Sequence, residues 1–542
     1  MGTDIENPIC VLHVALEFGP ATFGGLGRVA TQMVDAQNRF EISDKRQFDA
    51  SIITPFYPYL YANYANNAQA VATIEHLYDN KIVTSKIFCV EIGETRHYLV
   101  QPPPEYQHLF AMEYLPEIYT DTQISPFIQR VKFFNSCVAA YVNNPNIGSN
   151  HPAPQILQLH DWQSALVPKL LKELHLNTSI KSVFTVHIDN GDRGTYNCSE
   201  LDGIGLNFHK STCIMKALGL INSDKIVAVS PRFLRECIET KFDDPELEFL
   251  RKIFAWSSVQ NKTMGIANGI NYADYCPLGK QINDAANVHF EKARIKQQIA
   301  AELQGSRLLW KFDPNLPLIL YVGRYSPEKG PETFEQVIRD TAGRATFVAV
   351  GRGMTDEVFR VMVQHSRQTD NVFITASETE QAQLIQLLRA GADIVFIPSH
   401  RDAFGLVGPE GLANGSIIVT TGVGGLRDVV QGLNYSDTDD IIGNGIFYED
   451  MPEAEHNPAL TQALNQALDL FATLTDDQLN AMQTKIMLDA QKFDWAAENG
   501  SLHQYLQIYK SLIHVPEDNT PRPLRLPKPS PFGKRRKTTK TK

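Results

Sequence analysis

Short apolar segments alternate with helical segments in the C-terminal half of the chain, and this alternation restricts the fold more than any other feature. Each apolar segment is four to seven residues long and lacks polar alternation, which is typical of a strand buried on both faces. Strands separated by helices form parallel sheets with helices on both sides. The predicted strands are 316–322, 345–350, 372–375, 394–397 and 417–420. The predicted helices are 331–341, 355–367, 379–390 and 405–413.

The N-terminal half repeats this pattern less regularly. An apolar strand at 8–15 is followed by a glycine-rich turn and a helical run that extends to Gln37. Further strands are predicted at 156–159, 183–186 and 226–229, whereas residues 45–125 are expected to hold hairpins or insertions. Parallel sheets bind ligands at the carboxyl ends of their strands. The predicted fold class is therefore α/β, with two Rossmann-like domains facing across a cleft.

Composition indicates a globular protein. The chain has 542 residues, enough for at least two domains, with 43% hydrophobic and 20% charged residues. It contains no run of eighteen apolar residues, and its acidic N-terminus lacks the apolar core of a signal peptide. Its seven cysteines lie far apart without CxxC spacing, which favours free thiols in a reducing compartment over a zinc site. We expect a cytoplasmic protein without a membrane span.

The C-terminal end of the chain is strongly basic. Residues 521–542 carry nine Lys or Arg and no acidic residue, although the net charge of the whole chain is −11. This Pro-rich and then Lys-rich composition predicts a disordered tail. Such a tail either contacts an anionic partner, such as lipid, nucleic acid or an acidic protein, or is simply solvated. Composition alone leaves both interpretations open.

Two cations and two carboxylates mark the strand-to-helix turns of the C-terminal half. Arg324 and Lys329 stand five residues apart, in a segment that begins with Gly323 and ends with Gly330. Arginine binds phosphate bidentately and lysine supplies a mobile charge, so this pair suits a diphosphate. The alternative is a solvated loop.

The two carboxylates, Asp402 and Glu410, lie eight residues apart around the start of a predicted helix. A carboxylate accepts hydrogen bonds from sugar or ribose hydroxyls. Otherwise, Asp402 would cap the helix and Glu410 would lie on its surface. Together with the cations, these residues predict a sugar-nucleotide site.

The first turn of the N-terminal half contains Gly24 and Gly25. Glycines let the backbone approach a ligand closely, and the following helix N-terminus favours a phosphate. The turn does not match the dinucleotide-binding fingerprint, so an NAD site is not predicted. Taken alone, such a turn is more often a simple chain reversal.

Histidines end two neighbouring predicted strands. His160 and Asp161 follow one strand, and His187 follows the next. A single strand-end histidine is usually structural, and Asp161 has the position of a helix cap. Two histidines on one sheet edge make a role in a site more credible.

These motifs together resemble the glycogen/starch synthase family, within the retaining glycosyltransferases of GT-B fold, over most of residues 8–512. The resemblance is carried by Glu17 with Gly24-Gly25-Leu26, His160-Asp161-Trp162, Thr185-Val186-His187, Asn268-Gly269-Ile270, Gly323-Arg324 with Lys329-Gly330, Phe404-Gly405-Leu406 with Glu410, Gly424-Gly425-Leu426, and Phe493-Asp494-Trp495 followed by Tyr505.

The resemblance implies roles for these residues. Arg324 and Lys329 would hold the donor diphosphate and stabilise the leaving group, and His187 would contact the donor sugar. Asp402 and Glu410 would match the two acids of the E-x7-E pattern found in the wider retaining families. The other implied donor-binding residues are Gly24, Gly25, Asn268, Phe404, Gly405 and Leu406. The implied acceptor or cleft residues are Glu17, His160 and Asp161.

The resemblance also implies a domain organisation and a substrate class. Residues 1–277 would form an acceptor-side domain, 278–488 a nucleotide-sugar domain, 489–514 a helix that crosses back to the first domain, and 515–542 the basic tail. The substrate would be a nucleoside-diphosphate sugar carrying a hexose, with glucose as the favoured sugar, and no cofactor or metal would be needed. The acceptor would be a glucan.

Three positions depart from the family pattern and keep other functions open. Thr22 stands where bacterial synthases have Lys, Arg28 where they have Asp, and Asp402 where the family has Glu. One alternative is a transferase that uses GDP-mannose or UDP-glucose on a protein or small-molecule acceptor, including an effector exported without a cleavable signal. A second, from another class, is a non-catalytic scaffold that only binds the nucleotide sugar.

Overall fold

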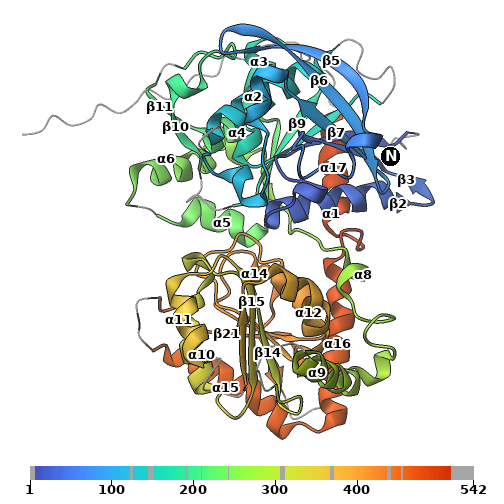
Figure 1. Cartoon of the computed structure of the whole chain (residues 1–542), viewed down its shortest axis with the longest axis vertical. Helices are drawn as coiled ribbons and strands as arrows, with labels where there is room; N and C mark the ends of the chain where they lie inside the picture. Colours follow the sequence, from blue (N-terminus) through green and yellow to red (C-terminus); the bar gives the residue numbers. More distant parts are fainter. Residues whose placement is uncertain are drawn as a thin grey trace, which may run out of the picture.

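The computed structural model describes most of the chain. The described residues are 7–122, 126–144, 152–176, 179–188, 193–208, 210–241, 243–305, 312–365, 371–435, 441–452, 454 and 456–513. Figure 1 shows two α/β bodies, one built from the N-terminal half of the chain and the other from the C-terminal half. The basic tail at 515–542 lies outside the described residues.

The sheet of the N-terminal body has nine strands within the described ranges, in the order β13-β12-β9-β8-β1-β4-β7-β6-β5. All neighbouring strands from β13 to β7 are parallel, and β5 and β6 add an antiparallel edge. The strand bounds are β1 (Ile9–Val14), β4 (Phe48–Pro55), β5 (Gln69–Tyr78), β6 (Lys81–Ile92), β7 (Thr95–Gln101), β8 (Ile156–His160), β9 (Lys181–Val186), β12 (Lys225–Ala228) and β13 (Thr263–Gly265).

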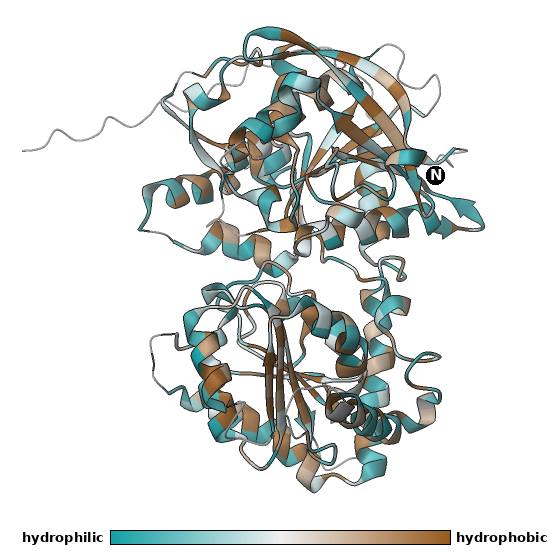
Figure 2. Ribbon diagram, in the orientation of Figure 1, coloured by the Kyte–Doolittle hydropathy of each residue, from teal (hydrophilic) through white to brown (hydrophobic). Residues whose placement is uncertain are grey.

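The sheet of the C-terminal body has six strands among the described residues, all parallel, in the order β16-β15-β14-β17-β18-β21. These strands are almost entirely buried, and Figure 2 shows them as hydrophobic elements between amphipathic helices. The strand bounds are β14 (Leu318–Arg324), β15 (Thr346–Arg352), β16 (Val372–Thr375), β17 (Ile394–Ile397), β18 (Ile417–Thr420) and β21 (Gly445–Phe447).

Helices cover both sheets. Those of the N-terminal body include α1 (Gly25–Arg39), α2 (Phe127–Val142), α3 (Leu166–Glu173), α4 (Met215–Asn222), α5 (Pro231–Glu239) and α6 (Pro245–Phe254). Those of the C-terminal body include α9 (Val288–Gly305), α10 (Phe334–Asp340), α11 (Asp356–His365), α12 (Glu378–Gly391), α13 (Val407–Leu412), α14 (Leu426–Val429), α15 (Pro458–Thr473) and α16 (Asp476–Asp489).

The last helix, α17 (Ser501–Ile513), returns to the N-terminal body (Figure 1). Tyr505 and Tyr509 are buried in one cluster with Val11 and Phe48 of the N-terminal sheet. The chain therefore crosses between the bodies twice, once before α9 and once after α16. The fold class predicted from the sequence, two Rossmann-like sheets with a returning C-terminal helix, is confirmed.

Several boundaries differ from the sequence prediction for local reasons. The strand predicted at 316–322 is Leu318–Arg324, so Arg324 ends a strand instead of lying within a loop. The helix predicted at 405–413 is Val407–Leu412, because Gly405 has a φ of +79°, outside the helical region. Residues 45–125 contain the strands β4 to β7, including the predicted hairpin.

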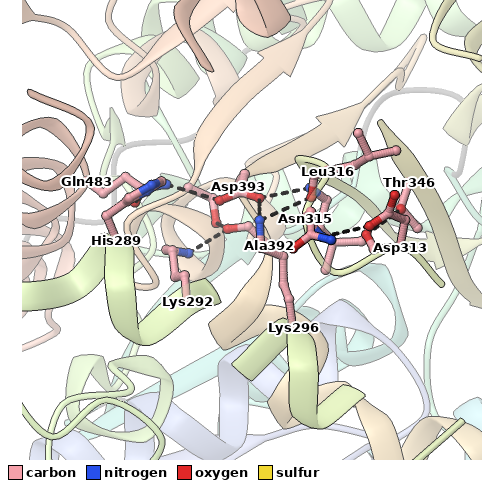
Figure 3. Close-up of polar contacts among 12 residues, drawn as sticks. His289, Lys292, Lys296, Asp313, Asn315, Leu316, Thr346, Ala392, Asp393 and Gln483 are labelled. Carbon is pink, nitrogen blue, oxygen red and sulfur yellow. Dashed lines mark hydrogen bonds and ion pairs between the residues drawn. The ribbon is translucent and has the colours of Figure 1, made fainter. Parts of the chain in front are cut away.

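A buried polar cluster fixes the amino-terminal ends of β14 and β17 (Figure 3). Asp393, 1% exposed, accepts hydrogen bonds from Lys296 Nζ at 2.8 Å and from the backbone N–H of Leu318 at 2.9 Å. Burial would raise the pKa of Asp393, but Lys296 and Lys292 of α9 lower it below its ordinary value. The cluster ties α9 to the sheet.

Two findings address the class of the protein. No helix within the described ranges combines the length and apolar character needed to cross a membrane. The seven cysteines all lie in described ranges, and all are free thiols.

We predict that Lys296→Met destabilises the protein by about 3 to 5 kcal/mol, because it leaves the carboxylate of Asp393 buried without its ion-pair partner. The free energy of unfolding in urea at neutral pH checks this. Lys485→Met is the control, because exposed Lys485 pairs with exposed Asp489; a change within about 0.5 kcal/mol is expected there. A loss below about 1 kcal/mol for Lys296→Met would contradict the role of this pair.

Candidate active site

The two bodies meet through segments that follow the carboxyl ends of their strands. Arg28 of α1 donates to Glu410 of α13 at 2.7 Å, and Arg352 at the end of β15 donates to the carbonyl of Phe23 at 3.3 Å. The backbone N–H of Arg232, the second residue of α5, donates to Asp428 of α14 at 2.8 Å. The carboxyl edges of the two parallel sheets therefore face each other, the position at which such sheets bind ligands.

Glu17 organises the glycine-rich turn at this interface. It is 2% exposed, and its carboxylate accepts hydrogen bonds from the backbone N–H groups of Phe23 at 2.6 Å and Gly24 at 2.8 Å. Tyr119 donates to its other oxygen. A Cβ at Gly27 would lie 2.5 Å from the Glu17 carboxylate, so this glycine is required for the close approach. Gly25 is exposed at the start of α1. Glu17 thus shapes the turn from beneath.

Asp161 joins the ends of β8 and β9. Its carboxylate accepts a hydrogen bond from the backbone N–H of Trp162 at 2.7 Å, the capping role considered from the sequence. Its other oxygen accepts from the backbone N–H groups of His187 at 2.9 Å and Ile188 at 3.1 Å. Asp161 has a φ of +57°, a strained conformation that is maintained by these bonds. Asp161 therefore fixes the backbone that carries His187.

The predicted histidines are in direct contact. His160 Nδ1 lies 2.9 Å from His187 Nε2, and His160 Nε2 lies 2.9 Å from Nδ1 of His13 on β1. Burial lowers the pKa of His187 to about 3 and that of His13 to about 4, and it lowers the pKa of His160 well below its ordinary value. All three rings are therefore neutral at physiological pH.

The predicted cations lie beside the carboxylates of the C-terminal edge. Lys329 Nζ donates to Asp402 Oδ2 at 2.7 Å, so the structure brings two predicted site residues together. Arg324, whose side chain is 57% exposed, pairs with Glu328 at 2.9 Å. Gly330 has a φ of +69°, and a Cβ there would lie 2.1 Å from the carbonyl oxygen of Pro398. The Lys329 turn is thereby packed directly against the segment that leads to Asp402.

A charged His400 side chain links the Lys329 turn to the segment that leads to Asp402. Its Nε2 lies 2.5 Å from Glu332 and its Nδ1 lies 2.7 Å from Asp450. The hydrogen bond to Glu332, followed by that to Asp450, raises the pKa of His400 to about 9 despite partial burial. The backbone N–H of His400 also donates to the carbonyl of Glu328 at 3.0 Å. An imidazolium therefore holds the Lys329 turn to the Asp402 segment.

The turn at Gly424 packs on the Asp402 segment from the other side. Gly424 has a φ of +53°, and a Cβ there would lie 1.6 Å from the carbonyl oxygen of Asp402. Phe404 is buried, Leu406 is half-buried, and a Cβ at Gly405 would collide with Leu426. Phe404, Gly405 and Leu406 thus connect Asp402 to α13, and their positions follow from backbone packing.

Glu410 is engaged on both oxygens. It is 1% exposed; Arg28 binds Oε1 at 2.7 Å, and Arg389 of α12 binds Oε2 at 2.8 Å. The Arg389 guanidinium lies over the ring of Tyr275, 5.3 Å from its centroid. Asn268, 5% exposed, is held by its backbone N–H, which donates to the carbonyl of Val229 at 3.1 Å. Glu410 therefore joins both bodies and does not lie on a free helix surface.

Some residues of the site were not singled out from the sequence. His13 interrupts an apolar strand, so its signal was present as a polar residue in a buried segment. Arg28 was noted only as a departure, and its partner Glu410 lies 382 residues away, a separation that no local pattern bridges. His400 and Tyr119 gave no local signal. Among the described residues, no group of three or more His, Cys, Asp or Glu side chains could hold a metal ion.

Two family models match the chain. The model of the starch synthase catalytic domain matches residues 10–252, and the model of glycosyl transferases group 1 matches residues 309–466. The first match ends within the N-terminal body and the second covers the C-terminal sheet. Each body is therefore matched by its own family model.

Curated relatives extend over most of the chain. It is 27% identical over 409 residues to "Glycogen synthase 1" of Synechococcus sp. (strain JA-3-3Ab), and the alignment covers 71% of this chain and 77% of the relative. It is 24% identical over 534 residues to "Glycogen synthase" of Kosmotoga olearia, and the alignment covers 94% of this chain and 99% of the relative. The likeness to the second relative thus covers most of both bodies.

Solved structures share the fold. The catalytic domain of Starch Synthase IV from Arabidopsis thaliana, bound to ADP and acarbose, matches with a TM-score of 0.75 and 21% identity over 94% of this chain and 100% of that one. Sucrose-phosphate synthase from Thermosynechococcus elongatus matches with a TM-score of 0.56 and 17% identity over 93% and 99%. At these identities the likeness establishes the two-sheet architecture.

We predict that Arg28→Ala loosens the association of the two bodies by about 1 kcal/mol, because it removes one charged hydrogen bond from buried Glu410 while solvent already screens the half-exposed Arg28. The radius of gyration from small-angle X-ray scattering should increase. Arg39→Ala is the matched control, because Arg39 lies on the same helix but pairs with Asp35 of that helix. An unchanged radius in both variants would contradict the interdomain role of Arg28.

We predict that His400 makes stability depend on pH. Its folded-state pKa of about 9 exceeds the ordinary value of 6.5, so its stabilisation is complete below pH 6.5 and is lost as pH rises through 9. Thermal unfolding of the unmodified protein and of His400→Gln should differ most near pH 6 and converge toward pH 9.5. A difference that stays constant across this range would mean that the imidazolium charge does not hold the two segments together.

Proposed function

Because the chain is a glycogen/starch synthase-like glycosyltransferase of GT-B fold, we propose that it transfers glucose from a nucleoside-diphosphate glucose to a glucan hydroxyl, with retention of anomeric configuration. One observation carries this proposal. Lys329, beside Asp402 and close in sequence to Arg324, lies on one of two facing sheet edges, and the His187 group lies on the other. Relatives named glycogen synthase support the glucan acceptor.

The cations of the C-terminal edge would bind the diphosphate. Asp402 holds Lys329 at 2.7 Å, so the ammonium group is already placed on the edge. A diphosphate carries more negative charge than one carboxylate and would draw Lys329 toward itself. Arg324 is exposed and can turn from Glu328 to a phosphate in bidentate geometry. Both cations would then face the charge that develops on the leaving group.

The proposed transfer breaks the bond between the sugar C1 and the diphosphate oxygen, and forms a bond from C1 to the acceptor oxygen on the same face. The acceptor proton passes to the departing phosphate oxygen, so no protein nucleophile is needed. The transition state resembles an oxocarbenium ion. Closure of the two bodies, through contacts such as Arg28 with Glu410, would exclude water and limit donor hydrolysis.

The remaining predicted residues would shape the donor site. Gly24 and Gly25 would bring backbone N–H groups at the start of α1 toward the diphosphate. Asp402, once released from Lys329, would accept hydrogen bonds from donor hydroxyls. Glu410 would offer only the lone pairs that its two arginines leave free. Glu17 and Asp161 act on the protein backbone and would support the site from beneath.

We also propose the domain bounds expected from the sequence. An acceptor-side domain at 1–277 is supported by β13, which ends at Gly265, and a nucleotide-sugar domain at 278–488 by α9, which begins at Val288. The returning segment at 489–514 is supported by the burial of α17 against the N-terminal sheet. We propose further that the enzyme needs no cofactor and acts in the cytoplasm.

The other hypotheses receive less support. The named relatives favour neither a protein or small-molecule acceptor nor a non-catalytic scaffold, and export as an effector has no support among them. The departure at Thr22 keeps the nucleotide of the donor open. Contact of the basic tail with an anionic partner stays a prediction.

We predict that purified protein releases nucleoside diphosphate from a glucose donor and that glycogen stimulates this release. ADP-glucose, UDP-glucose, GDP-mannose and UDP-N-acetylglucosamine are compared with and without glycogen. Release at the same rate with and without glycogen would instead favour a protein or small-molecule acceptor. Binding without any release would support the scaffold.

We predict that Lys329→Ala and Arg324→Ala each lower kcat about 100-fold or more, because each removes a cation that stabilises the leaving group. Steady-state kinetics with the preferred donor check this. Lys485→Ala, at an exposed position on α16, should keep the full rate. Near-normal turnover of Lys329→Ala would remove this residue from the proposed mechanism.

A further inference from the structure

A continuous row of hydrogen-bonded side chains runs from α1 to the interface between the bodies. Gln37 Oε1 on α1 lies 2.8 Å from His13 Nε2 on β1. His13 Nδ1 lies 2.9 Å from His160 Nε2 at the end of β8, and His160 Nδ1 lies 2.9 Å from His187 Nε2 just after β9. Adjacent rings are stacked, with centroids 5.2 and 5.1 Å apart. Three neighbouring strands and one helix thus build a single chain of contacts.

The contacts of Gln37, at the α1 end of the row, determine which atoms of the row donate and which accept. The amide nitrogen of Gln37 donates to the hydroxyl of Tyr509 on α17 at 3.4 Å, and Tyr509 donates to Gln158 at 2.7 Å. Gln158 in turn donates to Thr185. The amide of Gln37 therefore presents its oxygen to His13. That oxygen can only accept, so the proton of His13 must be on Nε2.

Because all three rings are neutral, the donor and acceptor roles of the His13 nitrogens determine those of His160 and His187 in turn. A neutral imidazole has one N–H and one bare nitrogen. With Nε2 protonated, His13 accepts at Nδ1 from His160 Nε2–H, and His160 then accepts at Nδ1 from His187 Nε2–H. Burial lowers the pKa of each ring, so a second proton does not interrupt the series. His187 is left with a bare Nδ1.

The bare nitrogen is open to a ligand. No hydrogen bond joins His187 Nδ1 to any residue in the described ranges, and the atom is not among the fully buried polar atoms left without a partner. His187 keeps 8% of its surface exposed. It follows β9, on the sheet edge that faces the C-terminal body. Asp161 holds its backbone N–H, so the ring is fixed at both its backbone and its inner nitrogen.

We propose that Gln37, His13 and His160 are positioning residues that hold His187 as a hydrogen-bond acceptor, and that its ligand is a hydroxyl hydrogen of the donor sugar. A phosphate oxygen, which also only accepts, would be repelled by the bare Nδ1. The row thereby separates the binding of the sugar on the N-terminal edge from that of the diphosphate on the C-terminal edge. This inference rests on the proposed function for the identity of the ligand but not for the state of the rings.

The protonation state is tested first on the unliganded full-length protein. With histidine labelled with ¹⁵N, two-bond nitrogen–proton correlations at pH 7 distinguish the two neutral tautomers and the imidazolium. Loss of signals in His13→Gln, His160→Gln and His187→Gln assigns the three rings. We expect all three to carry their proton on Nε2. A proton on Nδ1 of His187, or a doubly protonated ring in the row, would overturn the proposal.

A second measurement tests how the row acts on His187. Gln37→Met has a similar shape but no acceptor, so we expect its His187 to show both tautomers. Tyr509→Phe removes the hydroxyl that anchors the Gln37 amide and that also donates to Gln158, and it serves as the second variant should Gln37→Met fail to fold. The proportion of the Nδ1–H tautomer of His187 should rise in either variant. An unchanged proportion in a folded variant would show that the row does not set the tautomer.

The ligand is tested with a series of monodeoxy analogues of the preferred sugar donor. In the unmodified protein, removal of one particular hydroxyl should lower kcat/KM about 10- to 100-fold. In Gln37→Met this penalty should shrink to within about threefold, while the penalties at the other hydroxyls persist. Equal penalties in both proteins would overturn the assignment of the ligand. If no donor is turned over, the proposed function fails, and the tautomer measurement still decides the state of His187.

Discussion

Glu410 lies almost fully buried between two guanidinium groups, one from each body of the chain. A buried carboxylate is stable only with such partners, so Arg28 and Arg389 must stay close to it. This requirement brings the start of α1 against α13, and with it the glycine-rich turn against the edge that carries Lys329 and Asp402. The geometry of the proposed donor site depends on this contact. Arg28 is one of the positions that depart from the family pattern, and the structure gives that departure a partner.

Much of the fold could be predicted because its signals are local. The strands β15 to β18 are short continuous apolar segments, and their residues matched the expected ranges closely. The strand β13 was missed because three residues, none of them buried, are too few for a pattern. The start of α13 was misplaced because Gly405 adopts a positive φ that composition does not reveal. Whether a glycine uses that freedom is decided by packing, here against Leu426.

The candidate site shows the same contrast between local sequence signals and long-range contacts. Lys329 and Asp402 were each predicted, and they lie together because two strand-to-helix turns share one sheet edge. The contacts of His13 with His160 and of Arg28 with Glu410 span 147 and 382 residues. Only the strand order places such residues side by side, and that order is a property of the whole chain. Local sequence patterns therefore point to most side chains proposed for the site but not to the contacts that hold them in place.

The two sheet edges differ in electrostatic character. On the N-terminal edge, burial keeps three histidines neutral. Their hydrogen bonds then determine which ring nitrogens donate and which accept. On the C-terminal edge, Lys329, Arg324 and His400 are cations balanced by carboxylates. Neutral histidines suit sugar hydroxyls and a cationic edge suits a diphosphate, which fits the transfer proposed above.

The most direct test of this account is an experimental structure of the full-length protein with a bound nucleoside diphosphate. The account predicts the diphosphate at the C-terminal edge, with Lys329 moved from Asp402 to a phosphate oxygen, Arg324 turned from Glu328 toward the same group, and the start of α1 close by. A diphosphate bound elsewhere, or one bound while Lys329 remains on Asp402, would contradict it.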